Sequence, residues 1–116
     1  MEQNAKPEAR AHTKYIRMSA QKVRLVVDQV RGMPVDKALA VLRFSTKRAA
    51  LPIANTIKSA AANANEIYGL DPQDLVVSKI FCNEGPTMKR ARFGARGRYK
   101  PILKRSSHVT VVVTEK

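Results

Sequence analysis

The sequence predicts an α+β fold: three helices packed on a small antiparallel β-sheet, with a long, extended basic β-hairpin. Apolar residues recur at helical spacing in three successive segments between residues 19 and 69. Residues 75–82 and 108–114 are rich in β-branched side chains, which is typical of strands. The connection between these strands has roughly 20 residues, whereas ordinary hairpin loops have about 2 to 5, so we expect both strands to continue into it.

The length and composition indicate one domain in a reducing compartment. At 116 residues we expect a loose tail over 1–12 and a single domain over 13–116, with the hairpin at about 83–107. The apolar runs are far shorter than the ~18 to 20 residues that span a bilayer, and the polar start predicts no signal peptide. Cys82 is the only cysteine, which excludes an intrachain disulfide, favours the cytosol and predicts a small packed side chain.

Positive charge is concentrated in the C-terminal third. The chain has 22 Lys and Arg against 9 Asp and Glu, and no acidic residue lies between Glu84 and Glu115. Eight cations lie within that acid-free segment: Lys89, Arg90, Arg92, Arg96, Arg98, Lys100, Lys104 and Arg105. Burying unpaired charge is costly, so this segment is expected to lie in water or to contact a polyanion.

The N-terminal half predicts a strand and two helices. Residues 13–18 alternate as a short strand does, and Ser19 is positioned to cap a helix that ends at Gly32. The apolar stripe of this helix is formed by Val23, Val26, Val27 and Val30. Pro34 suits the start of a second helix that runs to about Phe44.

A third helix follows with an alanine-rich apolar face. Ser45 or Thr46 is expected to cap it, and Gly69 to end it. Pro52 either kinks this helix or marks its first turn. The expected buried residues are Ala50, Ile53, Ala54, Ile57, Ala61 and Ala64.

The last strand alternates, so that Val109, Val111 and Val113 are expected to face the core. If the strands continue into the basic connection, about ten residues per arm at ~3.3 Å each extend the hairpin by roughly 30 Å. A two-stranded ribbon alone is marginally stable in water, so we expect a phosphate-bearing partner to stabilise it.

The basic segment also carries aromatic residues, Phe93 and Tyr99, and this combination is typical of nucleic-acid binding. A solvated, disordered arm is the alternative, and the flanking strand patterns argue against it. Gly94-Ala95-Arg96-Gly97 matches the GXXG loop of KH modules, but that loop joins helices. Here the glycines more simply permit a tight tip.

A second group of cations surrounds the start of the first helix, at Arg17, Lys22 and Arg24. They either form a solvated face or contact phosphates. The contact is favoured, because the N-terminus of a helix itself attracts anions.

Catalytic and metal-binding patterns are weak, so we expect no enzyme, no metal and no cofactor. Ser106, Ser107 and His108 are consecutive and have no obvious carboxylate partner. His12 and His108, with one distant cysteine, do not match the spacing of metal ligands.

Three segments and their spacing resemble the bacterial large-subunit ribosomal protein L-twenty-two family. They are YIRMSAQKVRLVVDQVRG at 15–32, KSAAANANEIYGLD at 58–71 and EGPTMKRARFGARGRYKPILKRSSHVTVVV at 84–113. The resemblance covers about 11–113. It implies that three helices pack on an antiparallel sheet and that a hairpin threads into ribosomal RNA, lining the nascent-peptide exit tunnel.

The resemblance also implies contact residues. The RNA-contacting hairpin residues would be Lys89, Arg90, Arg96, Arg98, Lys104, Arg105 and His108, and those of the first helix Arg17, Ser19, Lys22 and Arg24. Arg92 and Lys100 join them as cations of the same segment. The tunnel-facing tip would be Arg92, Phe93 and Gly94, although the family usually has a proline and a basic residue at the last two positions.

The expected function is therefore a structural constituent of the large ribosomal subunit, cytoplasmic and ribosome-bound. Its expected partners are large-subunit ribosomal RNA, neighbouring ribosomal proteins and the nascent polypeptide, with no membrane and no homo-oligomer. The alternative is a DNA-bending architectural protein with basic β-arms. Such a protein needs a self-complementary apolar face for its dimer, whereas the helical stripes here suffice for one core.

Overall fold

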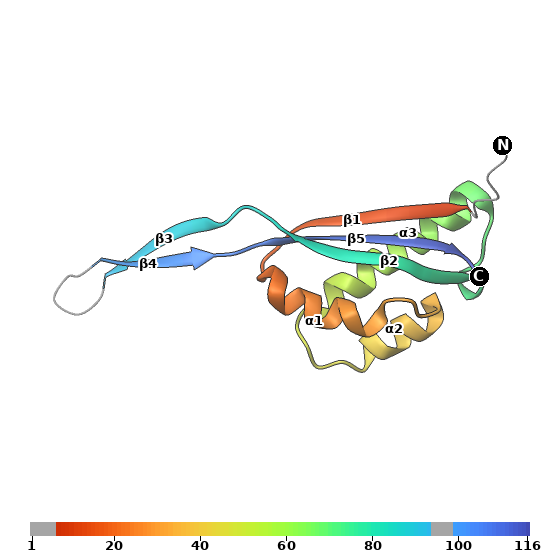
Figure 1. Cartoon of the computed structure of the whole chain (residues 1–116), viewed down its shortest axis with the longest axis horizontal. Helices are drawn as coiled ribbons and strands as arrows, with labels where there is room; N and C mark the ends of the chain where they lie inside the picture. Colours follow the sequence, from red (N-terminus) through yellow and green to blue (C-terminus); the bar gives the residue numbers. More distant parts are fainter. Residues whose placement is uncertain (1–6, 94–98) are drawn as a thin grey trace.

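The computed structural model describes residues 7–93 and 99–116, and it describes the backbone alone at 88, 90–93 and 99–102. The helices are α1 (Ala20–Val30), α2 (Val35–Arg43) and α3 (Ala50–Tyr68), followed by a short 3₁₀ turn, Pro72–Asp74 (Figure 1). The strands are β1 (Glu8–Ile16), β2 (Leu75–Glu84), β3 (Met88–Phe93), β4 (Tyr99–Lys104) and β5 (Ser107–Glu115).

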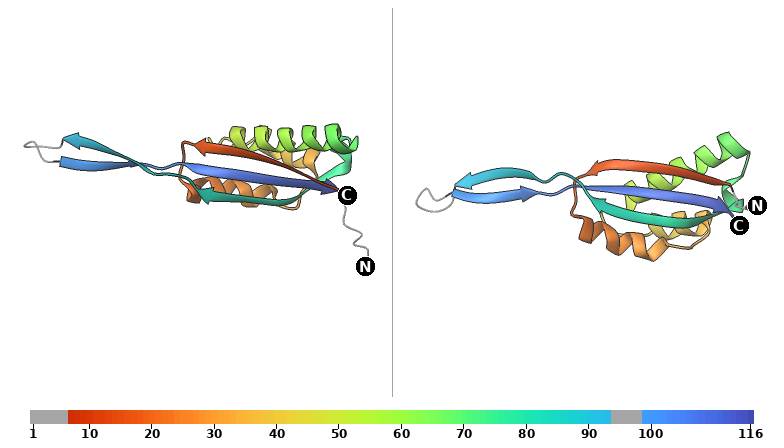
Figure 2. Two further views of the ribbon diagram at one scale, coloured as in Figure 1. Left: turned by 90° about the horizontal axis from the view of Figure 1, so that it is seen from above. Right: turned by 45° about the horizontal axis from the view of Figure 1, so that its top comes forward.

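The strands form two antiparallel sheets. The body contains a three-stranded sheet in the order β1-β5-β2, and β3 and β4 form a separate two-stranded sheet. The helices lie together against one face of the body sheet, and the other face has no helix over it (Figure 2). The predicted α+β fold with three helices on a small antiparallel sheet is confirmed.

The core forms where the helices meet the sheet. Val109, Val111 and Val113 of β5 are fully buried, as their alternation predicts. On the opposite face of β5, Thr110 and Val112 are nearly as buried, which the alternation does not predict. β5 is the central strand, and the longer side chains of β1 and β2 flank these two residues: Thr110 lies between His12 and Phe81, and Val112 between Arg10 and Lys79.

The helix ends follow the glycines. Gly32 and Gly69 have φ angles of 80° and 69°, the left-handed region that glycine adopts without steric cost. Ser19 occupies the N-cap position of α1 with extended backbone, but its side chain makes no capping hydrogen bond. The predicted position is confirmed, and the predicted hydroxyl cap is wrong.

The start of α3 differs from the prediction. The N-cap is Ala49, so the expected cap by Ser45 or Thr46 is wrong. Pro52 lies in the first turn, where a missing N–H removes no intrahelical hydrogen bond. The proline therefore belongs to the start of the helix rather than to a kink.

The first strand is longer than predicted. β1 begins at Glu8, so residues 8–12 belong to the sheet rather than to the expected loose tail. Ala9 and Ala11 are buried at alternate positions, and these small side chains give a weak hydrophobic signal in a polar stretch. Residues 1–6 lie outside the described residues, and the division into a tail and one domain stays a prediction.

Segments outside the sheet bond to both of its edge strands. On β1, Asn63 of α3 donates its side-chain N–H to the carbonyl of Arg10, at 2.8 Å. On β2, the backbone of the α1–α2 connection pairs with Val77. The N–H of Gly32 donates to the carbonyl of Val77, and the N–H of Val77 donates to the carbonyl of Met33. These bonds occupy backbone groups that another strand could otherwise pair with.

The β3–β4 hairpin extends away from this body (Figure 1). The molecule measures 66 × 36 × 21 Å, and its radius of gyration is 17.6 Å, against about 13 Å for a compact domain of this length. The sequence predicts that the body strands continue into the hairpin. In the structure the hairpin strands follow the body strands, but with interruptions at 85–87 and 105–106. Pro86 has no N–H for the ladder, which accounts for the break in that arm.

Candidate nucleic-acid interface

The hairpin carries the largest group of predicted contact residues. Lys89 lies on β3, Lys104 ends β4, Arg105 follows it, and all three side chains are exposed. Of the others, Arg90, Arg92 and Phe93 lie on β3 and Lys100 on β4, where Arg92 pairs with Lys100 and Phe93 with Tyr99. Gly94, Arg96 and Arg98, with the rest of the GXXG match, lie outside the described residues.

The two arms of the hairpin stay hydrogen-bonded where they leave the body. The N–H of Gly85 donates to the carbonyl of Ser106 at 2.9 Å, and the hydroxyl of Ser106 donates to the carbonyl of Pro86 at 2.7 Å. A Cβ atom on Gly85 would lie 2.6 Å from Ser106 Oγ and 3.0 Å from His108 Cε1. A larger residue here would have to displace the side chains of Ser106 and His108, so glycine suits this close approach of the arms.

The start of α1 lies beside this join. A hollow of about 290 Å³ is lined by Ser19, Ala20 and Gln21 from the helix and by Glu84, Gly85, Thr87, Arg105 and Ser106 from the base of the hairpin. The fold therefore brings together Ser19 and Arg105, two predicted contact residues from distant parts of the sequence. Arg17 and Lys22 are exposed next to them in the chain.

His108 is held at the same junction by Tyr15. Tyr15 has a φ of 61°, uncommon for a residue with a side chain, at the irregularity near the end of β1. Its N–H donates to His108 Nδ1 at 3.0 Å, and the two rings meet edge to face with centroids 5.0 Å apart. His108 is half-buried, so its predicted contact role is combined with a structural one.

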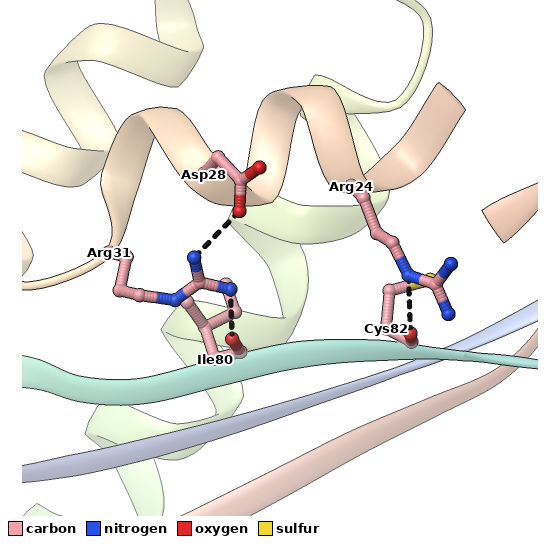
Figure 3. A network of polar contacts seen from close by, with 5 residues as sticks. All are labelled: Arg24, Asp28, Arg31, Ile80 and Cys82. Atoms are coloured by element: carbon pink, nitrogen blue, oxygen red, sulfur yellow. Dashed lines mark hydrogen bonds and ion pairs between the residues drawn. The ribbon is translucent and has the colours of Figure 1, made fainter. Parts of the chain in front are cut away.

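The side chain of Arg24 contacts β2. Its Nε donates to the carbonyl of Cys82 at 3.0 Å, and its terminal nitrogens point away from that carbonyl (Figure 3). Cys82 lies on an edge strand, so this bond satisfies an acceptor that the sheet leaves open. Arg24, one of the predicted contact residues, therefore also ties α1 to β2.

The sequence reading missed a second arginine of the same kind. Arg31 donates to the carbonyl of Ile80 at 2.9 Å and to Asp28 Oδ1 at 2.6 Å (Figure 3). Arg24 and Arg31 are seven residues apart, or two helical turns, and therefore lie on one side of α1. This spacing was the signal that could have revealed a shared role on β2.

Replacing Arg24 with Met should lower the free energy of unfolding by about 1 kcal/mol, because the carbonyl of Cys82 loses its donor. Urea unfolding followed by circular dichroism measures the change. Lys22→Met is the matched control: it removes the same charge from an exposed position of the same helix. Equal unfolding midpoints for the two variants would contradict the structural role of Arg24.

Cys82 packs as an apolar residue, as predicted. It is 4% exposed, and burial raises the pKa of its thiol, an effect that Ser107 and the charge of Arg24 partly offset. The thiol is therefore protonated at neutral pH and is a poor nucleophile.

Metal-binding clusters and membrane-spanning helices are both absent from the described part of the chain. Among residues 7–93 and 99–116, no group of three or more His, Cys, Asp or Glu side chains could hold a metal ion. None of the helices described is both long and apolar enough to cross a bilayer.

Comparison with known proteins agrees with the resemblance seen in the sequence. Residues 11–114 match the family described as Ribosomal protein L22p/L17e. The large ribosomal subunit protein uL22 of Magnetococcus marinus is 57% identical over 106 residues, which is 91% of this chain and 94% of that protein. The protein of the same name from Pediococcus pentosaceus is 51% identical over 108 residues, 93% of this chain and 92% of that protein. The chain therefore belongs to the L22p/L17e family of ribosomal proteins and is not an enzyme.

Proposed function

We propose that this protein is a structural constituent of the large ribosomal subunit, that it binds ribosomal RNA, and that its β3–β4 hairpin lines the nascent-peptide exit tunnel. Its partners are large-subunit RNA, neighbouring ribosomal proteins and the nascent polypeptide, and it works as a monomer bound to cytoplasmic ribosomes. The observation that carries the proposal is the shape of the molecule: a two-stranded, basic sheet that extends from a compact body.

The physical argument concerns what stabilises the hairpin. The hairpin has only two strands and no helix over it, and it concentrates eight cations between residues 89 and 105. Repulsion among these charges opposes the ribbon in water, whereas phosphates relieve it and release counterions. An extended arm of this kind reaches into folded RNA, where a compact basic patch would contact only its surface.

The base of the hairpin adds a second group of contacts. Ser19 lines the same hollow as Arg105, Arg17 and Lys22 are exposed close to Ser19 in the chain, and the first turn of α1 adds unpaired backbone N–H groups to this region. Phosphate contacts at the body and along the arm would fix the direction in which the hairpin enters the RNA.

The DNA-bending alternative receives less support. It requires a dimer with a large apolar face shared between two copies. The valine face of α1 and the alanine face of α3 are buried in the chain's own core. A monomer that contacts RNA through its arm accounts better for this packing.

We expect the purified protein to bind large-subunit RNA with a steep salt dependence. Each phosphate contact adds about 0.7 to 0.9 to the slope of log affinity against log salt concentration, and contacts along the hairpin should bring the slope to roughly 4 or more. Filter binding over a salt series measures this slope, with large-subunit RNA and an unrelated RNA of equal length. A flat dependence would contradict the electrostatic argument, and a tight dimer in analytical ultracentrifugation would favour the DNA-bending alternative.

A further inference from the structure

A second candidate interface lies on the helical side of the body, away from the hairpin. The connection between α2 and α3 borders a hollow of about 690 Å³ that is lined by residues of both helices. In Figure 1 this connection runs along the side of the helices that faces away from the strands. No residue of this region belongs to the predicted contact set.

The most exposed large apolar side chain of the described residues lies at this hollow. Phe44, at the C-terminal end of α2, is 81% exposed, and Leu51 across the hollow on α3 is 69% exposed. An exposed phenylalanine ring forgoes roughly 2 kcal/mol of burial free energy. A ligand that covered Phe44 and Leu51 would recover part of it.

The backbone around Phe44 is well anchored. Its N–H donates to the carbonyl of Ala40 at 3.4 Å, and the N–H of Ser45 donates to that of Leu42 at 3.2 Å. Ser45 in turn accepts from the N–H of Lys47, through its hydroxyl, at 3.2 Å. The ring is therefore presented from a hydrogen-bonded helix end, which lowers the entropic cost of stacking on it.

The charges around the ring favour a polyanion. Arg43, Lys47 and Lys58 line the hollow together with a single acid, Asp36. The guanidinium of Arg43 lies 6.0 Å from the centre of the Phe44 ring. Lysine is depleted at protein–protein interfaces, whereas an exposed aromatic ring among Lys and Arg is the arrangement that binds unpaired nucleotides.

We propose that this hollow binds an unpaired nucleotide of ribosomal RNA, whose base stacks on Phe44 and whose flanking phosphates contact Arg43, Lys47 and Lys58. The volume of the hollow, about 690 Å³, lies within the roughly 300 to 1,000 Å³ that is usual for small-ligand sites. This inference rests on the proposed function, since it assumes that the protein binds ribosomal RNA. It adds a contact on the body that is independent of the hairpin.

The test uses the full chain and a short single-stranded oligoadenylate. The sequence contains no tryptophan, so Phe44→Trp introduces a single indole whose fluorescence a stacked base quenches. Phe81→Trp is the matched control, because Phe81 is 43% exposed on β2 and lies outside the hollow. We expect saturable quenching that weakens with salt in the first variant and none in the second. Equal quenching in both variants, or none in either, would overturn the inference.

A second measurement separates stacking from apolar docking. In a chain whose five hairpin cations are replaced by alanine (Lys89, Arg90, Arg98, Lys104 and Arg105), the remaining affinity for oligoadenylate reports on the body. Adding Phe44→Leu should weaken it by roughly fivefold or more, because leucine keeps the apolar bulk but cannot stack. Phe81→Leu, the control, should leave it unchanged.

The outcomes are distinguishable. Retained affinity in the Phe44→Leu chain would show that no base stacks on Phe44, and the RNA inference would be overturned. If the unsubstituted protein shows no salt-dependent affinity for large-subunit RNA, the proposed function itself fails.

Discussion

Incorporation into the large subunit is expected to collapse when five hairpin cations are replaced together by alanine: Lys89, Arg90, Arg98, Lys104 and Arg105. If each contacts one phosphate, the salt slope for RNA binding should fall by roughly 4, and the affinity at ~0.1 M salt by more than roughly a hundredfold. Filter binding measures the affinity. A sucrose gradient of cell lysate measures the incorporation, as the fraction of protein in the large-subunit peak.

The control removes the same number of charges from the body. Replacing Arg10, Lys14, Lys37, Lys79 and Lys116 with alanine changes the net charge equally, and all five side chains are exposed. If net charge alone drives binding, both variants should lose the same affinity. Equal losses would therefore contradict a specific role of the hairpin.

The tip should behave differently from the charged arms. Phe93→Ala removes an aromatic ring but no charge, so it should leave incorporation nearly unchanged. If the tip borders the tunnel, the same substitution should alter nascent-chain passage or macrolide susceptibility. Drug-inhibition curves and gradient profiles for both variants make the comparison, and equal incorporation defects would show that tip and arms act as one unit.

The parts of the fold that local chemistry decides were predictable from the sequence. The valine stripe and Gly32 define α1, and Gly69 ends α3, because a left-handed residue at that position favours glycine. The alternation in β5 correctly identified the residues that face the helices. In each case the signal lies within about ten residues of the element that it specifies.

The parts that depend on tertiary contacts were missed. The start of β1 depends on Ala9 and Ala11, whose small side chains are buried only because α3 packs across them. The hydrogen bond from Gly85 to Ser106 at the base of the hairpin joins positions that are far apart in the sequence. Neither contact has a periodic signature in the sequence.

The candidate site divides in the same way. The cations of the hairpin were evident from composition, since nothing in residues 85–114 offsets their charge. The bond from Arg24 to Cys82 was not, because it joins positions 58 residues apart. The exposure of Phe44 was also missed: at the end of an apolar stripe, a phenylalanine pointing to the core and one pointing to solvent have the same sequence pattern.

Replacing Ile53 with Ala should lower the free energy of unfolding by about 2 to 5 kcal/mol, because the loss of a fully buried side chain of α3 leaves a cavity in the core. Domains of this size are stable by only about 5 to 15 kcal/mol, so the loss is a large fraction. Leu51→Ala, two residues away on the same helix and 69% exposed, should change it by no more than about 0.5 kcal/mol. Urea unfolding followed by circular dichroism measures both, and similar midpoints would contradict the packing described for α3.

The Ile53→Ala variant also separates folding from RNA contact. Its hairpin cations are intact, so under conditions where the body stays folded its salt slope for RNA binding should equal that of the unsubstituted protein. The five-alanine variant should show the reverse: an unfolding midpoint close to normal and a reduced slope, because the substituted side chains that the structure describes, Lys89, Lys104 and Arg105, are exposed. A reduced salt slope for RNA binding in the folded Ile53→Ala variant would show that the position of the hairpin depends on core packing. The body and the hairpin would then form one cooperative unit, and the hairpin would not be stabilised separately.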